Sequence, residues 1–113
     1  MPTLTNVGTA YDTATCPLSK ELGLVRIDFT GVTQLIFDVF VNKVGTGTQS
    51  WQVWNESDGA EIGVINDAAA AGVKTLSATF NVNLSGQKLV RIRAKSSVST
   101  DDPVFFSASL MVK

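Results

Sequence analysis

The chain contains no histidine, and this removes the side chain on which most protein catalysis at neutral pH depends. Ser-His-Asp and Cys-His catalysis and histidine metal ligands are therefore excluded. Glu56, Asp58 and Glu61 are close enough in sequence for paired-carboxylate glycoside chemistry, but they flank a turn, where acidic residues are common. Cys16, the single cysteine, has no basic neighbour closer than Lys20 to activate its thiol. The sequence therefore predicts a protein that is not an enzyme.

Oxygen-bearing side chains in two loops have the chemistry that calcium prefers. One set is Asn55, Asp58 and Glu61, and the other is Asp101 and Asp102. Neither spacing matches a known calcium-binding loop, and solvated turns are commonly acidic. We therefore expect neither a metal site nor a cofactor.

Trp51 and Trp54 are three residues apart, so they point to opposite faces of an extended strand, whose side chains alternate. Trp51 shares its face with Val53 and is predicted to lie in the core, whereas Trp54 shares the outward face with Gln52. An outward tryptophan beside an amide could stack on a sugar ring or anchor a protein interface. The alternative is that residues 1–22 cover Trp54, because large aromatic side chains are usually mostly buried.

Four basic side chains gather on or near one face of a predicted strand. They are Lys88, Arg91, Arg93 and Lys95. One interpretation is a solvated face that protects a sheet edge against aggregation. The other is an electrostatic contact with an acidic surface of a neighbouring copy. That surface would consist of Glu56, Asp58, Glu61 and Asp67.

Alternation of apolar and polar residues recurs along the chain and predicts short strands separated by turns. The alternating stretches are 24–29, 35–43, 50–55, 61–66, 76–82, 89–95 and 104–112. No long amphipathic helix interrupts them. The pattern predicts an all-β fold, a jelly-roll-like antiparallel β-sandwich of about seven or eight short strands. Residues 1–22 are predicted to form an N-terminal arm or edge strand, and residues 23–113 a single sandwich domain.

The turn at Ser85-Gly86 joins two strands whose parity does not suit a hairpin. A two-residue turn would place Phe80 opposite Arg91, and so an apolar face beside a basic one. Either the loop contains a bulge, or the chain arches from one sheet to a second, facing sheet. We favour the arch.

The same alternation divides the apolar side chains between two faces. The predicted core comprises Val25, Ile27, Phe29, Phe37, Val39, Trp51, Phe80, Val90, Ile92, Ala94, Phe106 and Leu110. The opposite faces carry Ile36, Phe40, Trp54, Phe105 and Met111. Contiguous exposed apolar patches are uncommon on soluble monomers, so these five are predicted to form an interface in a homo-oligomer or larger assembly. The competing explanation is that residues 1–22 fold over the same surface.

Charge and composition exclude some partners. A formal net charge of -1 argues against a general nucleic-acid binder or a basic membrane anchor. No stretch approaches the roughly 20 consecutive apolar residues of a membrane-spanning helix. The residues before Cys16 lack a signal-peptide pattern, and one cysteine cannot form an intrachain disulfide. We therefore expect no nucleic-acid or membrane partner, and synthesis in a reducing cytoplasm.

Three features resemble small jelly-roll virion proteins of tailed bacteriophages, of the head-decoration or tail-accessory type. They are the threonine-rich start, Gly-Gln-Lys-Leu-Val-Arg-Ile-Arg-Ala-Lys at 86–95, and Asp-Asp-Pro-Val-Phe-Phe at 101–106. The resemblance implies a non-enzymatic virion component, made in the host cytoplasm, that assembles in many copies with itself and other virion proteins.

Two other functions compete with this one. A carbohydrate-binding module would hold a glycan with the outward-facing Trp54, although the missing secretion signal and the single exposed-aromatic candidate count against it. A small carboxylate-dependent glycosidase is the third, but a chain this short leaves little room for a substrate cleft.

Overall fold

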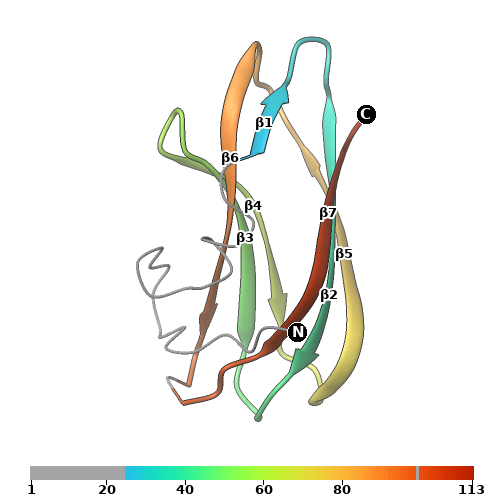
Figure 1. Cartoon of the computed structure of the whole chain (residues 1–113), viewed down its shortest axis with the longest axis vertical. Helices are drawn as coiled ribbons and strands as arrows, with labels where there is room; N and C mark the ends of the chain where they lie inside the picture. Colours follow the sequence, from blue (N-terminus) through green and yellow to red (C-terminus); the bar gives the residue numbers. More distant parts are fainter. Residues whose placement is uncertain (1–24, 99) are drawn as a thin grey trace.

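The computed structural model describes residues 25–98 and 100–113. These residues form seven strands in two antiparallel sheets that face each other (Figure 1). The strands are β1 (Val25–Asp28), β2 (Gln34–Lys43), β3 (Gln49–Asn55), β4 (Ala60–Asp67), β5 (Gly72–Asn81), β6 (Gln87–Ser96) and β7 (Val104–Val112). One sheet has the order β1-β6-β3-β4 and the other β5-β2-β7. The predicted antiparallel β-sandwich is confirmed, while the predicted arm at residues 1–22 lies outside the described residues.

The described residues include no helix that is long and apolar enough to cross a membrane.

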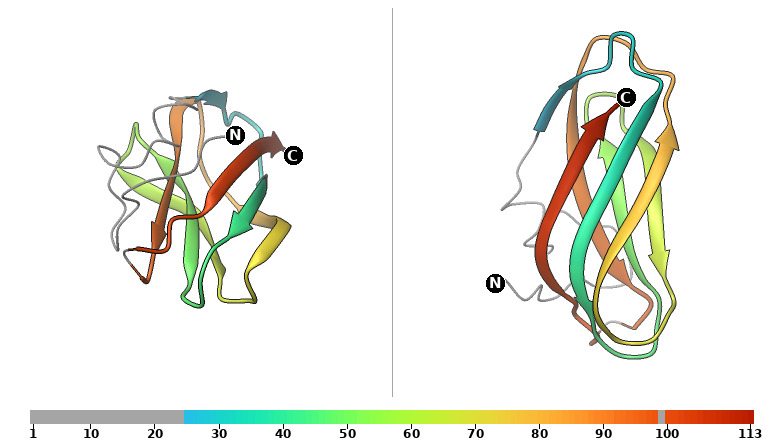
Figure 2. Two further views of the ribbon diagram at one scale, coloured as in Figure 1. Left: turned by 60° about the horizontal axis from the view of Figure 1, so that its bottom comes forward. Right: turned by 90° about the vertical axis from the view of Figure 1, so that its right-hand side faces the viewer.

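β5 and β6 follow each other in the chain but belong to different sheets. The connection between them includes Gly86, whose φ of 73° is a conformation that glycine adopts without strain. The chain therefore arches across the sandwich, as the parity of the two stretches predicted (Figure 2). Because the two strands lie in sheets that face each other, the apolar sides of both can point inward.

The core lies between the sheets. Its buried apolar side chains are Phe29, Leu35, Phe37, Val39, Val41, Trp51, Val53, Val90, Ile92, Ala94 and Phe105. The predicted members confirmed there are Phe29, Phe37, Val39, Trp51, Val90, Ile92 and Ala94. Ile27, Phe80 and Leu110 are partly buried and pack against this core. Val25 and Phe106 were placed wrongly.

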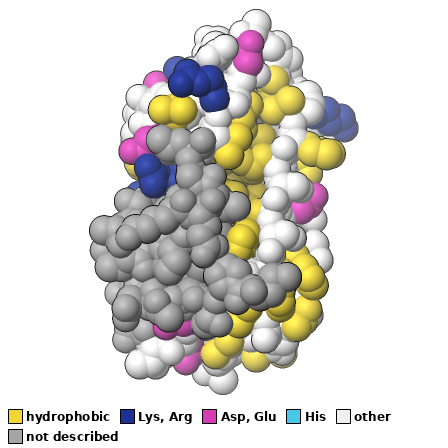
Figure 3. Space-filling view, in the orientation of Figure 1, with side chains coloured by type: hydrophobic (Ala, Val, Ile, Leu, Met, Phe, Trp, Pro, Cys, Tyr) yellow, Lys and Arg dark blue, Asp and Glu magenta, His cyan; other side chains and the backbone are white. Residues whose placement is uncertain are grey.

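Val25 is 42% exposed, against the prediction that it lies in the core. β1 has four residues and forms one edge of its sheet, so Val25 lies on the flank of the sandwich. There it lines an apolar hollow together with Ile92 of β6 and Leu110 of β7. Figure 3 shows a band of hydrophobic side chains along this flank.

A β-bulge explains why Phe105 and Phe106 exchange their predicted places. The register between β2 and β7 shifts after Phe40, so that Phe40 pairs with Ser107 but Val41 pairs with Phe105. The extra residue in β7 reverses the alternation beyond it. Phe105 is therefore 4% exposed and lies in the core, whereas the Phe106 ring packs beside Phe40 on the outside. The prediction that Phe105 belongs to an outer interface was wrong for this reason.

Gly63 of β4 and Phe80 of β5 are a point of close contact between the two sheets. A Cβ atom at Gly63 would lie 2.3 Å from the Phe80 ring, so the ring rests directly on the glycine backbone. We expect Gly63→Ala to lower the free energy of unfolding by about 1–3 kcal/mol, because overpacking displaces the ring. Phe80→Ala should cost about 2–5 kcal/mol, and in that background Gly63→Ala should cost much less. Urea denaturation of the double-mutant cycle measures this coupling, and equal costs in both backgrounds would contradict it.

Candidate functional site

The clearest candidate site is the side of the β5-β2-β7 sheet that is turned away from the core (Figure 2, right). Alternation along β2 points its even-numbered residues outward. The residues that define this surface, called the Phe40 face below, are Ile36, Asp38, Phe40, Ser77, Phe106, Ser109 and Met111. Phe40 is 39% exposed and Met111 56% exposed. The structure thus brings together three of the five predicted interface residues: Ile36, Phe40 and Met111.

Phe40, which is exposed, and Phe106, which is partly buried, form an aromatic pair at one end of the Phe40 face. Their ring centroids are 4.8 Å apart and their planes are inclined by 31°, closer to parallel than to perpendicular. The two rings come from adjacent, hydrogen-bonded strands, which fix their relative position. Sequence reasoning missed Phe106 because the bulge that turns it outward leaves no signal in the alternation. At this separation the two rings are stacked with an offset, so each covers part of one face of the other. Their remaining faces and edges form the aromatic surface called the aromatic platform below.

Asp38 lies between Ile36 and Phe40 on β2, about 7 Å from each along the strand. Its cross-strand neighbours are Ser77 on β5 and Ser109 on β7. The Ser77 hydroxyl donates a hydrogen bond to the Asp38 carboxylate. A row of hydroxyl, carboxylate and hydroxyl therefore crosses the sheet beside the aromatic platform. Apolar surface with a few placed polar groups is the combination by which ligand sites bind and orient their ligands.

Trp54 lies on the other sheet, on the outer side of β3, where it is half-buried. The Arg93 guanidinium carbon is 4.0 Å from the centroid of the Trp54 ring, a cation–π contact. Arg93 Nε donates to Gln52 Oε1 at 2.8 Å, and Gln52 Nε2 donates to Glu61 Oε1 at 2.9 Å. Arg93 thus covers one side of the Trp54 ring, and the sandwich separates Trp54 from the Phe40 face.

Two members of the predicted basic row pair with carboxylates of their own chain. The Lys88 ammonium is 3.0 Å from Asp58 Oδ2, and Arg91 Nε is 3.4 Å from Glu56 Oε2. Lys95 lies further along β6 and also has an interaction partner. Asp58 and Glu56 were predicted to contact the basic row from a neighbouring copy, but they lie beside it within the same molecule. A contact between copies through this row stays a prediction.

The titration of Asp58 should report its pairing with Lys88. Hydrogen bonds from the Lys88 ammonium, and next from the Asn55 amide, hold the pKa of the Asp58 carboxyl below its ordinary value of 3.8. Because the folded-state pKa is depressed, the pairing stabilises the fold above that ordinary value, and the contribution is lost as the pH falls through the folded-state pKa. Lys88→Met should raise this pKa toward 3.8, whereas Lys88→Arg should keep it low. An NMR titration of the carboxyl carbons measures it, and an unchanged pKa in Lys88→Met would contradict the pairing.

The candidate calcium and glycosidase residues in the turn between β3 and β4 have partners within the chain. Asn55 Nδ2 donates to Asp58 Oδ2 at 2.8 Å, and the Asp58 N–H donates to Asn55 Oδ1 at 3.1 Å. No three His, Cys, Asp or Glu side chains of residues 25–98 and 100–113 lie together as metal ligands. The cavity beside Glu61 is about 130 Å³, below the roughly 300–1,000 Å³ of small-molecule sites. Turn formation accounts for Asn55 and Asp58 without a ligand.

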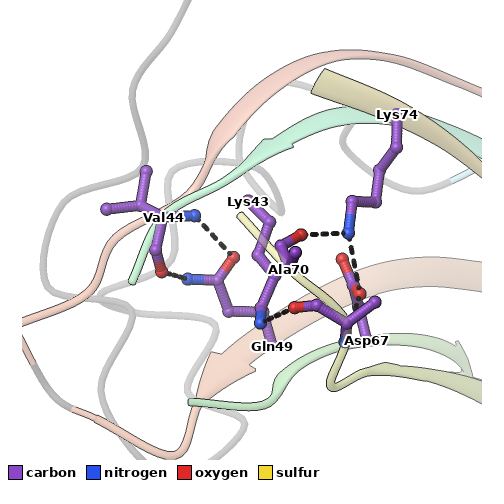
Figure 4. Close-up of polar contacts among 7 residues, drawn as sticks. Lys43, Val44, Gln49, Asp67, Ala70 and Lys74 are labelled. Atoms are coloured by element: carbon purple, nitrogen blue, oxygen red, sulfur yellow. Dashed lines mark hydrogen bonds and ion pairs between the residues drawn. The ribbon is translucent and has the colours of Figure 1, made fainter. Parts of the chain in front are cut away.

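A polar cluster at one end of the sandwich holds the lysines of β2 and β5 (Figure 4). The Lys74 ammonium is 3.1 Å from Asp67 Oδ1 and donates to the Ala70 carbonyl oxygen at 2.7 Å. Lys43 is 2% exposed, and its ammonium donates to the carbonyl oxygen of Ala69. Both ammonium groups are thereby directed toward the loop between β4 and β5, and away from the Phe40 face.

No family model matches the sequence, and no curated protein matches it. Among solved structures, the chain is similar to a carbohydrate-binding module, CBM6cm-2 from Cellvibrio mixtus lichenase 5A in complex with cellotriose. That match has 13% identity and a TM-score of 0.55, and covers 76% of this chain and 63% of that one. It shows a shared β-sandwich fold.

Two weaker matches contain CBM22 modules. One is the Clostridium thermocellum xylanase 10B CBM22-1-GH10 modules complexed with xylohexaose, at 21% identity and a TM-score of 0.48, covering 77% of this chain and 17% of that one. The other is the CBM22-1 xylan-binding domain of a Paenibacillus barcinonensis xylanase, at 11% identity and a TM-score of 0.41, covering 77% and 62%. The chain spans less than two thirds of the length of each of the three structures.

The resemblance to bacteriophage virion proteins was wrong, and so was the predicted role in capsid decoration or as a tail accessory. The solved structure that the chain resembles at a TM-score of 0.55 is a carbohydrate-binding module instead. The segments 86–95 and 101–106 that carried the resemblance prove to be β6 with its turn and the entry to β7. Alternating strands flanked by turn residues occur in every β-sandwich, so these segments could not distinguish one family from another.

Proposed function

We propose that this domain binds carbohydrate on the Phe40 face and does not itself catalyse a reaction. The observation that carries the proposal is the Phe40–Phe106 pair on the outer side of the sheet, beside the hydrogen-bonded Asp38 and Ser77. The shared fold with a carbohydrate-binding module in complex with cellotriose supports it. The absence of histidine from the sequence supports the non-catalytic part.

The chemistry of the Phe40 face suits a sugar ring. A pyranose has an apolar face of C–H groups and a rim of hydroxyls. Aromatic rings can bury that apolar face, and a carboxylate can accept charge-assisted hydrogen bonds from the rim hydroxyls. Phe40 and Asp38 are two residues apart on one strand, about 7 Å, so a single sugar chain can contact both.

Stacking is assigned here to Phe40 and Phe106 rather than to Trp54. Arg93 already lies against the Trp54 ring at 4.0 Å, and that contact would have to open before a sugar could stack on the same side. No corresponding cation–π contact lies over Phe40 within the described part of the chain.

Self-association through the same face is the second candidate, because Met111 and Val73 of this sheet are 56% and 61% exposed. A two-fold axis through the centre of the Phe40 face would bring the Asp38 carboxylates of two copies together, and like charges oppose such a contact. We therefore favour carbohydrate as the occupant. Sedimentation equilibrium should show a monomer, and a dimer that Phe40→Ser dissociates would favour self-association instead.

Affinity electrophoresis through gels containing a soluble β-glucan, a xylan, a galactomannan or a galactan tests the proposal. The protein should be retarded in at least one gel, and titration calorimetry with an oligosaccharide of that polymer should give a saturable isotherm. Folded protein that migrates freely in all four gels would contradict carbohydrate binding. Release of reducing ends from the bound polymer would contradict the absence of catalysis.

A further inference from the structure

We infer that Asp38 makes the Phe40 face selective for uncharged sugar chains, and that chains bearing carboxylate groups are rejected. This inference rests on the proposed function and concerns which carbohydrates the face accepts. It comes from the distribution of charge over the two sides of the sandwich.

Asp38 is a half-buried carboxylate at the centre of the Phe40 face. Ser77 donates a hydrogen bond to it. The ion pairs found in the described part of the chain are Lys74–Asp67, Lys88–Asp58 and Arg91–Glu56, so none of them involves Asp38. A sugar chain on the aromatic platform would therefore lie against a negative charge that none of these three ion pairs offsets.

Lys43 and Lys74, the lysines within the strands of this sheet, are directed away from Asp38. They point to carbonyl oxygens in the loop between β4 and β5, where Lys74 also pairs with Asp67 (Figure 4). Lys113 follows β7 and continues the alternation of Ser109 and Met111, so it is on the same side of the sheet as Asp38, but its backbone pairs with Gln34, four residues from Asp38 along β2. The two backbones are thus separated by about 13 Å, and the Lys113 side chain is exposed, so its charge is screened at physiological salt, where the Debye length is roughly 8 Å.

The four residues of the basic row belong to β6, which lies in the opposite sheet. Lys88 and Arg91 are engaged with Asp58 and Glu56 there. A carboxylate on a sugar held by the Phe40 face would have the sandwich between itself and that row. The basic row of β6 therefore cannot pair with the carboxylate of an acidic sugar bound on the Phe40 face.

A ligand carboxylate about 4 Å from Asp38 would be repelled, and the loss of affinity depends on the local dielectric constant. The loss is several-fold at the dielectric constant of bulk water and several hundredfold at the effective value of about 20 that is typical near a protein surface. We expect oxidised chains to bind about tenfold more weakly than their neutral counterparts. The difference should shrink as salt rises, because exposed charges are screened. Neutral hydroxyls carry no such penalty and can donate to Asp38.

The test uses each of the four polysaccharides named above in matched forms, native and oxidised. In the β-glucan, galactomannan and galactan, part of the primary hydroxyls is oxidised to carboxylates. Xylan has no primary hydroxyl on its pyranose units, so an unsubstituted xylan is compared with one bearing glucuronic acid side groups, which is counted with the oxidised forms. Wild-type protein is compared with Asp38→Asn, which keeps an acceptor oxygen for Ser77, and with Asp38→Lys, which reverses the charge. Asp28→Asn is the matched control, because Asp28 is exposed on β1 in the other sheet. An asparagine there can still accept the hydrogen bond from the Thr30 N–H.

Wild type and Asp28→Asn should prefer the native polymer about tenfold, Asp38→Asn should bind both forms within about threefold, and Asp38→Lys should prefer the oxidised form. Equal binding of both forms by wild type, or an unchanged preference in Asp38→Asn, would overturn the inference while leaving carbohydrate binding intact. Failure of the folded wild type to bind any of the eight polymers would overturn the proposed function, and the inference with it.

Discussion

Replacing Phe40 and Phe106 together by alanine should weaken carbohydrate binding by at least about tenfold while the domain remains folded. Exposed aromatic anchors at the centre of a binding surface commonly contribute 2 kcal/mol or more, and a change of about 1.4 kcal/mol is already tenfold in affinity. The Phe40 and Phe106 rings contact each other on the outside of the sheet, so their removal leaves no cavity in the core. Titration calorimetry of the double mutant and of each single mutant measures the loss.

The adjacent residues Phe105 and Phe106 provide a matched control. Phe105 is 4% exposed, so Phe105→Ala should cost about 3–5 kcal/mol of unfolding free energy and leave the affinity of the folded fraction unchanged. Phe106→Ala should instead weaken carbohydrate binding and cost less unfolding free energy than Phe105→Ala. A Phe40→Ala, Phe106→Ala variant that keeps full affinity would move the binding site away from this face.

Trp51→Ala should lower the free energy of unfolding by about 3–5 kcal/mol, among the largest effects on stability expected of a single substitution in this domain. The Trp51 side chain is 0% exposed and lies beside Phe105, with ring centroids 6.2 Å apart. The free energy of unfolding of an ordinary domain is about 5–15 kcal/mol, so this one substitution removes a large part of it. Urea denaturation followed by circular dichroism measures it.

Trp51→Phe is the informative companion variant. The phenyl ring refills much of the volume, and the substitution removes an indole N–H that has no hydrogen-bond partner among the described residues. Its cost should therefore be less than half that of Trp51→Ala. Trp54→Phe, at a half-buried position on the outer side of the same strand, should cost less still. Similar losses for Trp51→Ala and Trp54→Phe would contradict the assignment of Trp51 as the core residue.

Alternation along the sequence was sufficient to place most side chains on the correct side of their strands. In an extended strand, neighbouring side chains point to opposite faces whatever lies around them, so Phe37, Val39 and Trp51 could be placed in the core directly. The same local geometry showed that the stretches on either side of Ser85-Gly86 could not form a simple hairpin. The fold class and the arch between sheets followed from these local relationships.

The tertiary structure decided what depends on neighbouring strands. The register between β2 and β7 shifts at Phe40, and only this long-range pairing turns Phe106 outward and Phe105 inward. Strand order placed Ile36, Phe40 and Met111 on one sheet and Trp54 on the other. The alternation within a strand does not show which strands pair with it. The sequence therefore placed both Phe40 and Trp54 outward, but it could not show that Phe40 pairs with Phe106 beside Asp38.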